Sequence, residues 1–576
     1  MKDNYDKYGI EAGNHIPGTV IHQYLEDYVR FFGCLEFIRL NWRVESVEWK
    51  SNTDGDGGDG SWLVIASPTS TATAAAGNGP VHKDTTWEIV TKKLIIATGV
   101  TSEPILPLFA GQESFGMPLF HSRDLARLGP QILQPKEQKR VTVLGGNKSG
   151  WDSVYMCASS GVQVDWVIRE SGHGPIWMSP PYVTPFKLWL EGLVTRRLIT
   201  WFSPCVWGDF DGFGIIRRFL HGTWLGGKIV DFFWMMLSND LESLNDFDSH
   251  PDLAKLRPWM DPFWVASSLS IINYPTNFYD LIKNGMVRVH IADIDHLSHH
   301  AAHLSSGEVL SSSGFIACTG WRSEPRINFL PSSIESQLGL PWAPDPLDQR
   351  IVDLADAEIL HRFPRLKNQP PHNPKYRAIS KDAAAIAPHP YRLSRFMVPM
   401  NMVHERSIAF MGVTISLNTT MLAQTQALWI TAYLSNRLDL TSREHCPPTI
   451  TSLLSPSSSS SSSSSPTGSS SSISLLKPTL KTTTKNNNNN NIDPDLIWET
   501  ALHTQQCIWR YPGGFGKRNP DFVFDFLPYL DMLLCDLGLS SHRKSGLWAN
   551  CFQSYSAKDY KGIVHEWMRS QGLLSD

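Results

Sequence analysis

The stretch Val141-Thr-Val-Leu-Gly145-Gly146-Asn147-Lys148-Ser149-Gly150-Trp151-Asp152 decides the fold of this 576-residue chain. An apolar run enters a glycine-rich turn, a helical pattern continues over 154–158, and a second apolar run at 164–168 ends at Arg169. This is the strand–turn–helix–strand order of a dinucleotide-binding βαβ unit. The glycines let the backbone approach a pyrophosphate, and the helix N-terminus offers it free N–H groups and a partial positive charge.

The turn departs from the GxGxxG pattern at Asn147, whose side chain is expected to crowd a phosphate although asparagine tolerates a positive φ. The second strand ends at Arg169, where an acid usually binds the ribose 2′-hydroxyl, so the sequence favours the 2′-phosphate of NADP(H). Lys148 adds a second cation. The alternative is an ordinary glycine turn with Arg169 as a surface charge. The predicted nucleotide contacts are Gly145, Gly146, Asn147, Lys148, Ser149, Gly150, Asp152 and Arg169.

Length and composition restrict the remaining classes of function. A chain of 576 residues exceeds one compact core and predicts two or more domains. A formal net charge of −4 gives no indication of nucleic acid as a partner. Eight scattered cysteines without a CxxC pair favour a reducing, cytoplasmic location over a disulfide scaffold or zinc site.

The aromatic segment 222–237 is interrupted by Lys228 and Asp231, so it does not read as an integral membrane helix. We expect a buried helix or a wall of the substrate pocket, with weak membrane contact as the alternative.

Two similar turns bracket the βαβ unit. Ala97-Thr98-Gly99 and Cys318-Thr319-Gly320 each follow an apolar run, and each is followed after two further residues by Ser-Glu-Pro. Glycine permits a sharp turn beside a ligand, so Thr98, Gly99, Thr319 and Gly320 are predicted to contact cofactors. The alternative is two coincidental strand–turn units.

Between these turns, the stretch from Phe115 to Leu125 resembles the linker of flavin-containing monooxygenases and related class B flavoprotein monooxygenases. The Phe-x-Gly-x-x-x-His-Ser-Arg motif fits, except that Met117 replaces its glycine and Leu125 replaces the following aromatic residue or proline. The resemblance is nearest to fungal members and extends over roughly residues 10–440. It implies that His121 and Arg123 are catalytic-site residues that couple the position of NADP to the flavin.

The resemblance implies an α/β fold with two dinucleotide-binding, Rossmann-like domains and a C-terminal helical cap. The FAD domain is expected to be N-terminally incomplete, because no strand–GxGxxG–helix unit precedes residue 50 and the glycine cluster at 54–60 is acidic. The expected division is 1–125 for a partial FAD domain and linker, 126–330 for the NADP domain with an aromatic-rich insertion, 331–450 for the return to the FAD domain, 451–491 for a disordered Ser/Asn-rich insertion, and 492–576 for the cap.

The return segment carries a short strand at 408–412, a polar turn and an apolar helix. In the family this pattern leads back to the flavin, so the resemblance implies FAD contacts from Gly412, Asn418, Thr419, Thr420 and Gln424. The alternative is a capped core helix.

The implied function is FAD- and NADPH-dependent monooxygenation, in which one oxygen atom of O2 enters a small, apolar organic substrate of fungal secondary metabolism. Because the FAD turn is missing, a non-enzymatic NADP-binding relative is one alternative, and an NADPH-dependent flavin reductase is another. No metal is expected: the histidines at 296, 299, 300 and 303 are predicted to lie in a solvated loop of a hairpin formed by 287–291 and 308–310.

Overall fold

The computed structural model describes residues 7–11, 15–51, 60–69, 86–133, 139–183, 188–265, 269–322, 324–379, 388–454 and 492–574. The acidic glycine cluster at 54–60, apart from its last residue, and the Ser/Asn-rich insertion from residue 455 onward lie outside the described residues.

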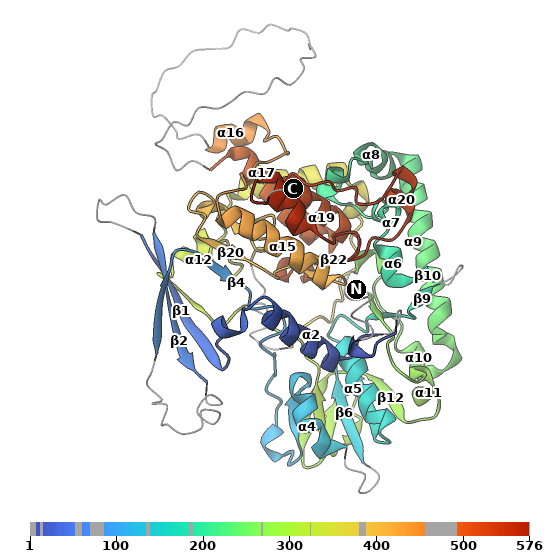
Figure 1. The fold of residues 1–576 in the computed structure, drawn as a ribbon. Helices are drawn as coiled ribbons and strands as arrows, with labels where there is room; N and C mark the ends of the chain where they lie inside the picture. Colours follow the sequence, from blue (N-terminus) through green and yellow to red (C-terminus); the bar gives the residue numbers. More distant parts are fainter. Residues whose placement is uncertain are drawn as a thin grey trace, which may run out of the picture.

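A five-stranded parallel sheet forms the lower part of the molecule in Figure 1. Its order is β12 (Val287–Ile291), β7 (Gln163–Ile168), β6 (Arg140–Leu144), β16 (Phe315–Ala317) and β5 (Leu119–His121). The helices α4 (Leu125–Ile132), α5 (Lys148–Ser159) and α11 (Phe278–Lys283) accompany it. The central strands are apolar on both faces, as expected for a parallel sheet between helices. The predicted βαβ unit and α/β class are therefore confirmed.

The predicted hairpin of 287–291 with 308–310 is wrong. β12 pairs in parallel with β7 and buries Val287 and Val289 completely, so it completes the nucleotide-binding sheet. A separate antiparallel sheet follows, formed by β13 (Ile294–Ser298), β14 (Ala301–Leu304) and β15 (Val309–Ser311). Strand pairing with a distant segment leaves no local signal, which is why the sequence pattern suggested the nearer partner.

The second α/β part contains the short parallel pair β4 (Leu94–Ile96) and β20 (Ile408–Phe410). Next to it, a mixed sheet projects at the left of Figure 1 in the order β17 (Asn328–Leu330), β1 (Trp42–Lys50), β2 (Ser61–Pro68) and β3 (Trp87–Thr91), with β17 parallel to β1 and the other neighbours antiparallel. The helix α2 (Gly18–Phe31) precedes this sheet and has no buried residue. β4 and β20 share one core with β1, β2 and β17.

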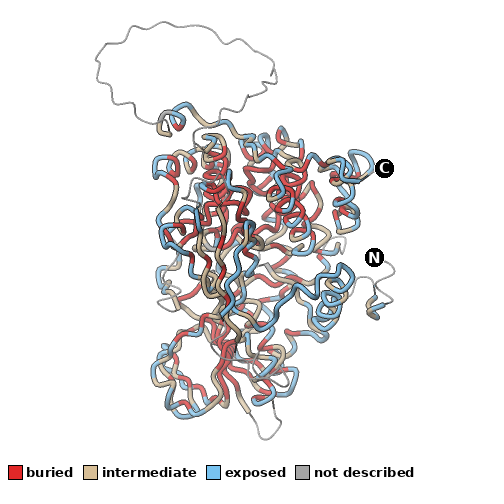
Figure 2. The backbone as a smooth tube through the Cα atoms, turned by 60° about the vertical axis from the view of Figure 1, so that its left-hand side comes forward, coloured by how far each residue is buried: buried red, intermediate tan, exposed pale blue. Residues whose placement is uncertain are grey.

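The aromatic insertion and the C-terminal helices share one core with the return segment, and Figure 2 shows the buried chain concentrated there. The insertion contains α6 (Leu190–Val194), α7 (Arg197–Thr200), α8 (Gly214–Gly222), α9 (Trp224–Asn245) and α10 (Pro251–Ala254). The return segment contains α13 (Gln349–Arg362) and α15 (Thr419–Leu434). The C-terminal part contains α17 (Pro494–Arg510), α18 (Phe515–Arg518), α19 (Phe526–Asp536), α20 (Leu547–Phe552) and α21 (Ile563–Ser570).

Buried ion pairs cross this shared core. Arg197 of α7 pairs with Asp531 of α19, and both side chains are fully buried. Arg395 of the return segment pairs with Glu499 of α17 and with Asp536 of α19. Because an unpaired buried charge is costly, these contacts hold the C-terminal helices on the body of the protein.

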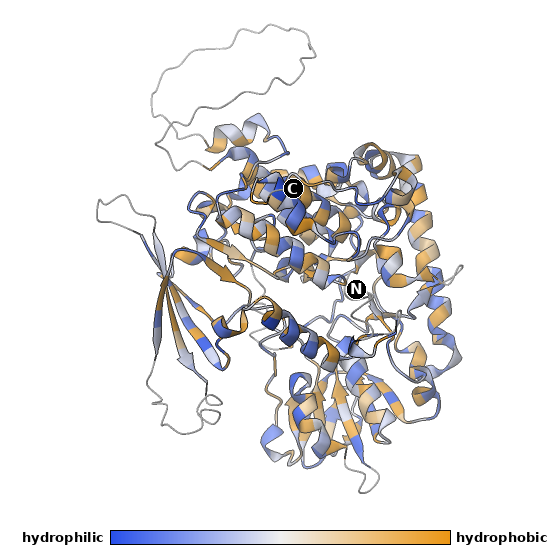
Figure 3. Cartoon of the chain, in the orientation of Figure 1, coloured by the Kyte–Doolittle hydropathy of each residue, from blue (hydrophilic) through white to orange (hydrophobic). Residues whose placement is uncertain are grey.

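The helix α9 is only half buried, which corrects the expectation of a buried helix. Trp224 is 78% exposed, and Leu225 and Phe232 are more than half exposed, as the orange outer side of α9 in Figure 3 indicates. The apolar residues are spread around the helix, so one side contacts the core while the other faces outward. No helix in the described part of the chain is both long and apolar enough to cross a bilayer.

Candidate functional site

The predicted nucleotide contacts of the first unit converge because the strands that carry them are parallel. β6 leads into Gly145, β7 leads into Arg169, β5 ends at His121, and β16 leads towards Thr319. All four strands run in the same direction, so their carboxyl ends meet at one edge of the sheet. β7 and β16 lie on opposite sides of β6, which makes this edge a topological switch point, the usual ligand crevice of such sheets.

Three glycines build the turn after β6 because neighbouring backbone leaves no room for a side chain. A Cβ at Gly145 would lie 2.3 Å from the Cys318 carbonyl oxygen, and Gly145 has a φ of +129°. A Cβ at Gly150 would lie 2.1 Å from the Gly145 carbonyl oxygen, and one at Gly146 would lie 3.0 Å from that of Gly174. The turn is therefore as close to the sheet as the backbone allows.

Asn147 does not crowd the turn, contrary to the expectation from its sequence position. Its side-chain oxygen accepts a hydrogen bond from the Gly150 N–H at 3.0 Å, and its Nδ2 donates to the Cys318 carbonyl at 3.1 Å. Asn147 is thus the N-cap of α5. Within the described residues, the N–H groups of Lys148 and Ser149 have no protein acceptor, so the positive end of α5 stays available to an anion.

Lys148 is held along the first turn of α5. Its ammonium group pairs with Asp152 one turn later and lies 3.0 Å from the Asn273 side-chain oxygen. The Tyr274 hydroxyl also donates to Asp152, at 2.9 Å. Burial, followed by the Asp152 charge, raises the pKa of Tyr274, so its hydroxyl stays protonated. Lys148 and Asp152 therefore form a fixed charged pair beside the turn.

Arg169 begins the loop after β7. Its Nη1 donates to the Ser171 hydroxyl and to the Arg377 carbonyl, each at 3.1 Å. Burial lowers the pKa of Arg169, while the nearby charge of Asp293 opposes that effect. Nε and Nη2 have no hydrogen-bond acceptor among the residues described. They leave two donors for an external anion such as a phosphate.

His121 and Arg123 connect the two predicted cofactor regions. The His121 ring is buried, packs edge-on against Trp321 at 5.0 Å, and accepts a hydrogen bond from the Arg123 N–H. Burial lowers the pKa of His121, opposed by a backbone hydrogen bond with Gly320, so the ring is neutral at pH 7. The exposed Arg123 side chain reaches the Ser102 carbonyl at 3.5 Å, beside the first Thr-Gly turn.

The second Thr-Gly turn is bonded to the segment after the first. The Thr319 hydroxyl donates to the Ile105 carbonyl, and the Ile105 N–H donates to the Gly320 carbonyl at 3.0 Å. Gly320 has a φ of +88° and open space where a Cβ would stand. The repeated Ala/Cys-Thr-Gly pattern therefore marks two loops that lie against each other.

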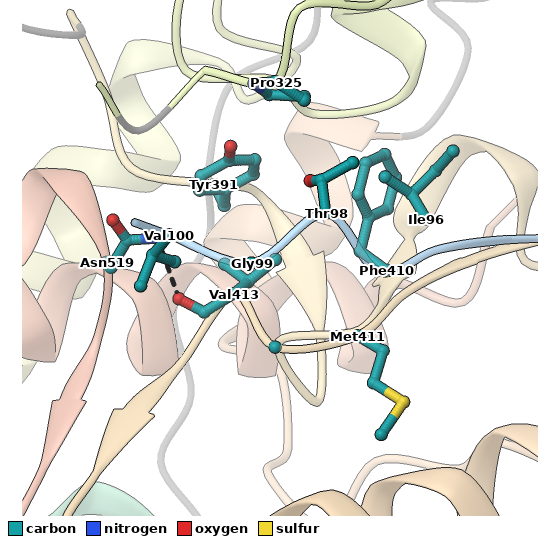
Figure 4. Close-up of a pocket in the computed structure, with 11 residues that line it drawn as sticks. Ile96, Thr98, Gly99, Val100, Pro325, Tyr391, Phe410, Met411, Val413 and Asn519 are labelled. Atoms are coloured by element: carbon teal, nitrogen blue, oxygen red, sulfur yellow. Dashed lines mark hydrogen bonds between the residues drawn. The ribbon is translucent and has the colours of Figure 1, made fainter. Parts of the chain in front are cut away.

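A cavity lies at the ends of β4 and β20 (Figure 4). It brings together the predicted residues Thr98, Gly99 and Gly412, because these parallel strands place the loops that follow them side by side. Gly99 and Gly412 both have positive φ. A Cβ at Gly412 would meet nothing within 4 Å, and one at Gly99 only the Ser102 hydroxyl at 3.9 Å. The cavity is also lined by Ile96, Val100, Pro325, Tyr391, Phe410, Met411, Val413 and Asn519.

Tyr391 and Asn519 are lining residues that the sequence did not indicate. Asn519 reaches the cavity because β22 (Asp521–Phe522) pairs with β21 (Ile415–Ser416). Its Nδ2 donates to the Val413 carbonyl at 2.9 Å, the dashed contact in Figure 4. Neither residue lies in a recognisable motif.

Four predicted FAD contacts do not line this cavity: Asn418, Thr419, Thr420 and Gln424. They lie at the start of α15, where the last three are exposed and the Thr419 hydroxyl donates to the Ser416 carbonyl.

The four histidines expected in a loop lie on β13, on β14 and in the turn between these strands. His296 stacks on His303 with ring centroids 4.0 Å apart, and His299 stacks on His300 at 3.9 Å. Across the described ranges, no group of three or more His, Cys, Asp or Glu side chains has the arrangement of a metal site.

Known proteins resemble this chain over most of its length. A family model described as L-lysine 6-monooxygenase/L-ornithine 5-monooxygenase matches residues 70–182. The FAD-dependent monooxygenase rstn6 of Aspergillus nomiae NRRL is 29% identical over 97% of this chain and 86% of its own length. The FAD-dependent monooxygenase resA of Aspergillus sclerotiorum is 29% identical over 96% of this chain and 85% of its own length.

Among solved structures, an open cyclohexanone monooxygenase is 14% identical over 73% of each chain, with a TM-score of 0.41. The S-allyl-L-cysteine S-oxygenase of Allium sativum is 11% identical over 98% of this chain and 75% of its own, also with a TM-score of 0.41.

Proposed function

Because this chain belongs to the class B flavin monooxygenases, we propose that it inserts one oxygen atom of O2 into a small, apolar organic substrate, using FAD and NADPH. The fungal source of the two similar monooxygenases favours a substrate of fungal secondary metabolism. The observation that carries this proposal is the pair of glycine-lined sites, one at the switch point of the parallel sheet and one at the ends of β4 and β20.

The first site suits NADPH. The turn at Gly145–Gly150 presents the free N–H groups of α5, and Arg169 presents two free donors at the end of the next strand. A pyrophosphate fits the helix N-terminus, and a 2′-phosphate fits the guanidinium group. Asn147 takes part by capping α5, which fixes the orientation of the N–H groups.

The second site suits FAD. Thr98, Gly99 and Gly412 present backbone without side-chain obstruction, and Tyr391 and Phe410 supply apolar walls. FAD bound there would supply the redox chemistry, with NADPH as the source of electrons. The Asn519 amide holds the Val413 turn in place.

We also propose the division of the chain expected from the sequence: 1–125, 126–330, 331–450, 451–491 and 492–576. His121 and Arg123 then act as coupling residues. A neutral His121 packed against Trp321 and bonded to Arg123 joins the two Thr-Gly loops, so a movement of one cofactor reaches the other through hydrogen bonds.

Two other functions are competing proposals. One is a non-enzymatic NADP-binding protein, and the other is a flavin reductase. The three functions differ in measurable ways. Only a monooxygenase couples NADPH oxidation to oxygen transfer, a reductase oxidises NADPH with added flavin alone, and a binding protein does neither.

The test is an absorbance spectrum of the purified chain with FAD, followed by NADPH under air. A protein-bound flavin spectrum that bleaches with NADPH and recovers with O2 is the expected result. An Asn519→Ala variant should bind FAD more weakly, whereas Lys561→Gln, an exposed control, should bind like the unmodified chain. NADPH binding without any flavin binding would contradict the monooxygenase proposal and favour the non-enzymatic relative.

A further inference from the structure

A second cavity, of about 230 Å³, lies beside the C-terminal end of α17 and is used by neither proposed cofactor site. Its walls are mainly aromatic and aliphatic, with one ammonium group and one amide. The lining residues are Gln369, Ile508, Trp509, Tyr511, Pro512, Gly513, Gly514 and Lys517. An apolar pocket with few polar groups is the usual form of a small-molecule site.

The cavity adjoins the proposed flavin site through a short piece of chain. Lys517 lines this cavity, and Asn519, two residues later, lines the other. Two residues span at most about 7 Å even when fully extended, so the two sites are neighbours. The two cavities are therefore lined by residues of one short segment of chain.

The opposite side of the cavity adjoins the proposed NADPH site. A Cβ at Gly513 would lie 3.3 Å from the His173 ring, and His173 belongs to the loop that begins at Arg169. The ring of Phe515 lies 4.9 Å from the same histidine. The lining of the cavity thus adjoins the loop that follows β7, and it also includes Lys517, two residues before a lining residue of the proposed flavin site.

Most polar groups of the lining are already bonded within the protein. The Trp509 indole N–H donates to Asp356 at 2.8 Å, and the Tyr511 hydroxyl donates to the buried Asp525. The Gln369 Nε2 amide group also donates within the protein, to the carbonyls of Leu366 and Trp509. These contacts fix the walls of the cavity before any ligand arrives.

Lys517 differs from these groups. In the described part of the chain its ammonium group has neither a carboxylate partner nor a hydrogen-bond acceptor. The cavity therefore combines rigid apolar walls with one uncompensated positive charge. A matching ligand has an apolar body and one anionic group, because a charge-assisted hydrogen bond strengthens where water is excluded.

We propose that this cavity binds the substrate of the oxygenation and that the substrate is a small apolar carboxylic acid. Its carboxylate pairs with Lys517, and its aromatic or aliphatic body lies against Trp509 and Ile508. This inference rests on the proposed monooxygenase function, since it assigns the substrate class of that site.

The test is calorimetric titration of the full chain with three acids, 3-phenylpropionate, 4-methylpentanoate and octanoate. The control ligand is 3-phenylpropanamide, the uncharged amide that corresponds to 3-phenylpropionate. At least one of the three acids should bind. Where 3-phenylpropionate binds, 3-phenylpropanamide should bind at least about tenfold more weakly than this acid. Lys517→Gln should weaken acid binding by a similar factor, and Lys517→Arg should restore most of it. Lys561→Gln is the matched control on the surface and should leave binding unchanged.

Three results would overturn the proposal: no acid binding up to about 10 mM, equal binding by the unmodified chain and the Lys517→Gln variant, or displacement of the acid by NADP+. The last result would assign the cavity to the nucleotide. A flavin spectrum recorded on the same samples separates the two proposals. Flavin binding without acid binding removes only the substrate assignment. Acid binding without flavin binding removes the monooxygenase function and leaves the cavity as a carboxylic acid site without a role in oxygenation.

Discussion

Arg169 should determine whether the protein prefers NADPH to NADH. Replacing it by methionine removes the guanidinium group but keeps an unbranched side chain of similar length. NADPH binding should weaken, because the 2′-phosphate loses its charged partner, whereas NADH binding should stay the same because NADH has a hydroxyl at that position.

The magnitude follows from the donors that remain free. Arg169 uses Nη1 for Ser171 and for the Arg377 carbonyl, which leaves Nε and Nη2 for the phosphate. Each hydrogen bond to a charged group contributes about 1.5–3 kcal/mol, so the loss of one such bond should lower the affinity for NADPH roughly 10- to 150-fold, and the loss of both should lower it further. The internal bonds of Nη1 are lost with the same substitution, and Arg169→Lys, which keeps the charge without the planar donors, should give an intermediate loss.

The measurement is fluorescence titration with NADPH and with NADH, at one ionic strength, for the unmodified chain and both variants. Circular dichroism at the same temperature shows whether the fold is intact. Arg127→Met, an exposed arginine outside the predicted nucleotide contacts, is the matched control. If Arg169→Met weakens both nucleotides equally, Arg169 supports the loop and does not read the 2′-phosphate.

Three further predictions concern stability. Gly150→Ala places a Cβ against a backbone carbonyl, so it should lower the free energy of unfolding in urea by about 1–3 kcal/mol and weaken NADPH binding. The control Gly227→Ala places its Cβ in open space and should not lower the free energy of unfolding. Asp531→Ala removes the hydrogen-bonded partner of the buried Arg197 and leaves Asp211, 3.5 Å away, as its remaining carboxylate among the described residues. It should cost at most about 3–5 kcal/mol in the same assay, and a loss below 1 kcal/mol would contradict the pairing. Burial lowers the pKa of His290, but its two carboxylate partners outweigh burial and raise it above the usual value near 6.5. Its charged ring should therefore stabilise the fold below about pH 6.5 and lose that effect as pH rises through the higher folded pKa, so melting temperatures of the unmodified chain and His290→Gln should converge at alkaline pH.

The sequence predicted the parts of the fold whose signals are local. The apolar run before Gly145, the helix after it and the strand ending at Arg169 follow from periodicity over a few residues. The two Thr-Gly loops were also identified locally, and the structure places Thr98 shortly after β4 and Thr319 shortly after the buried strand β16. The role of Asn147 was missed, because a cap depends on which N–H groups its side chain reaches.

The remaining features depend on which distant segments meet. Asn519 enters the proposed flavin cavity because a two-residue strand pairs across about a hundred residues, and so short a strand has no pattern of its own. The exposed side of α9 was unpredictable for a related reason. The composition of Trp224–Asn245 shows that the helix is apolar, but it does not show how many neighbours cover it.

The cavity between β4 and β20 is built from segments near residues 98, 325, 391, 412 and 519, which sets an order of events during protein synthesis. A ribosome makes about 5–20 residues per second, so the stretch between Gly412 and Asn519 takes on the order of 5–20 s to emerge. Throughout that interval the nascent chain carries the glycine loops but lacks the wall that closes them. Retention of flavin therefore reports that translation has passed Asn519, and prematurely terminated chains should leave the ribosome without it.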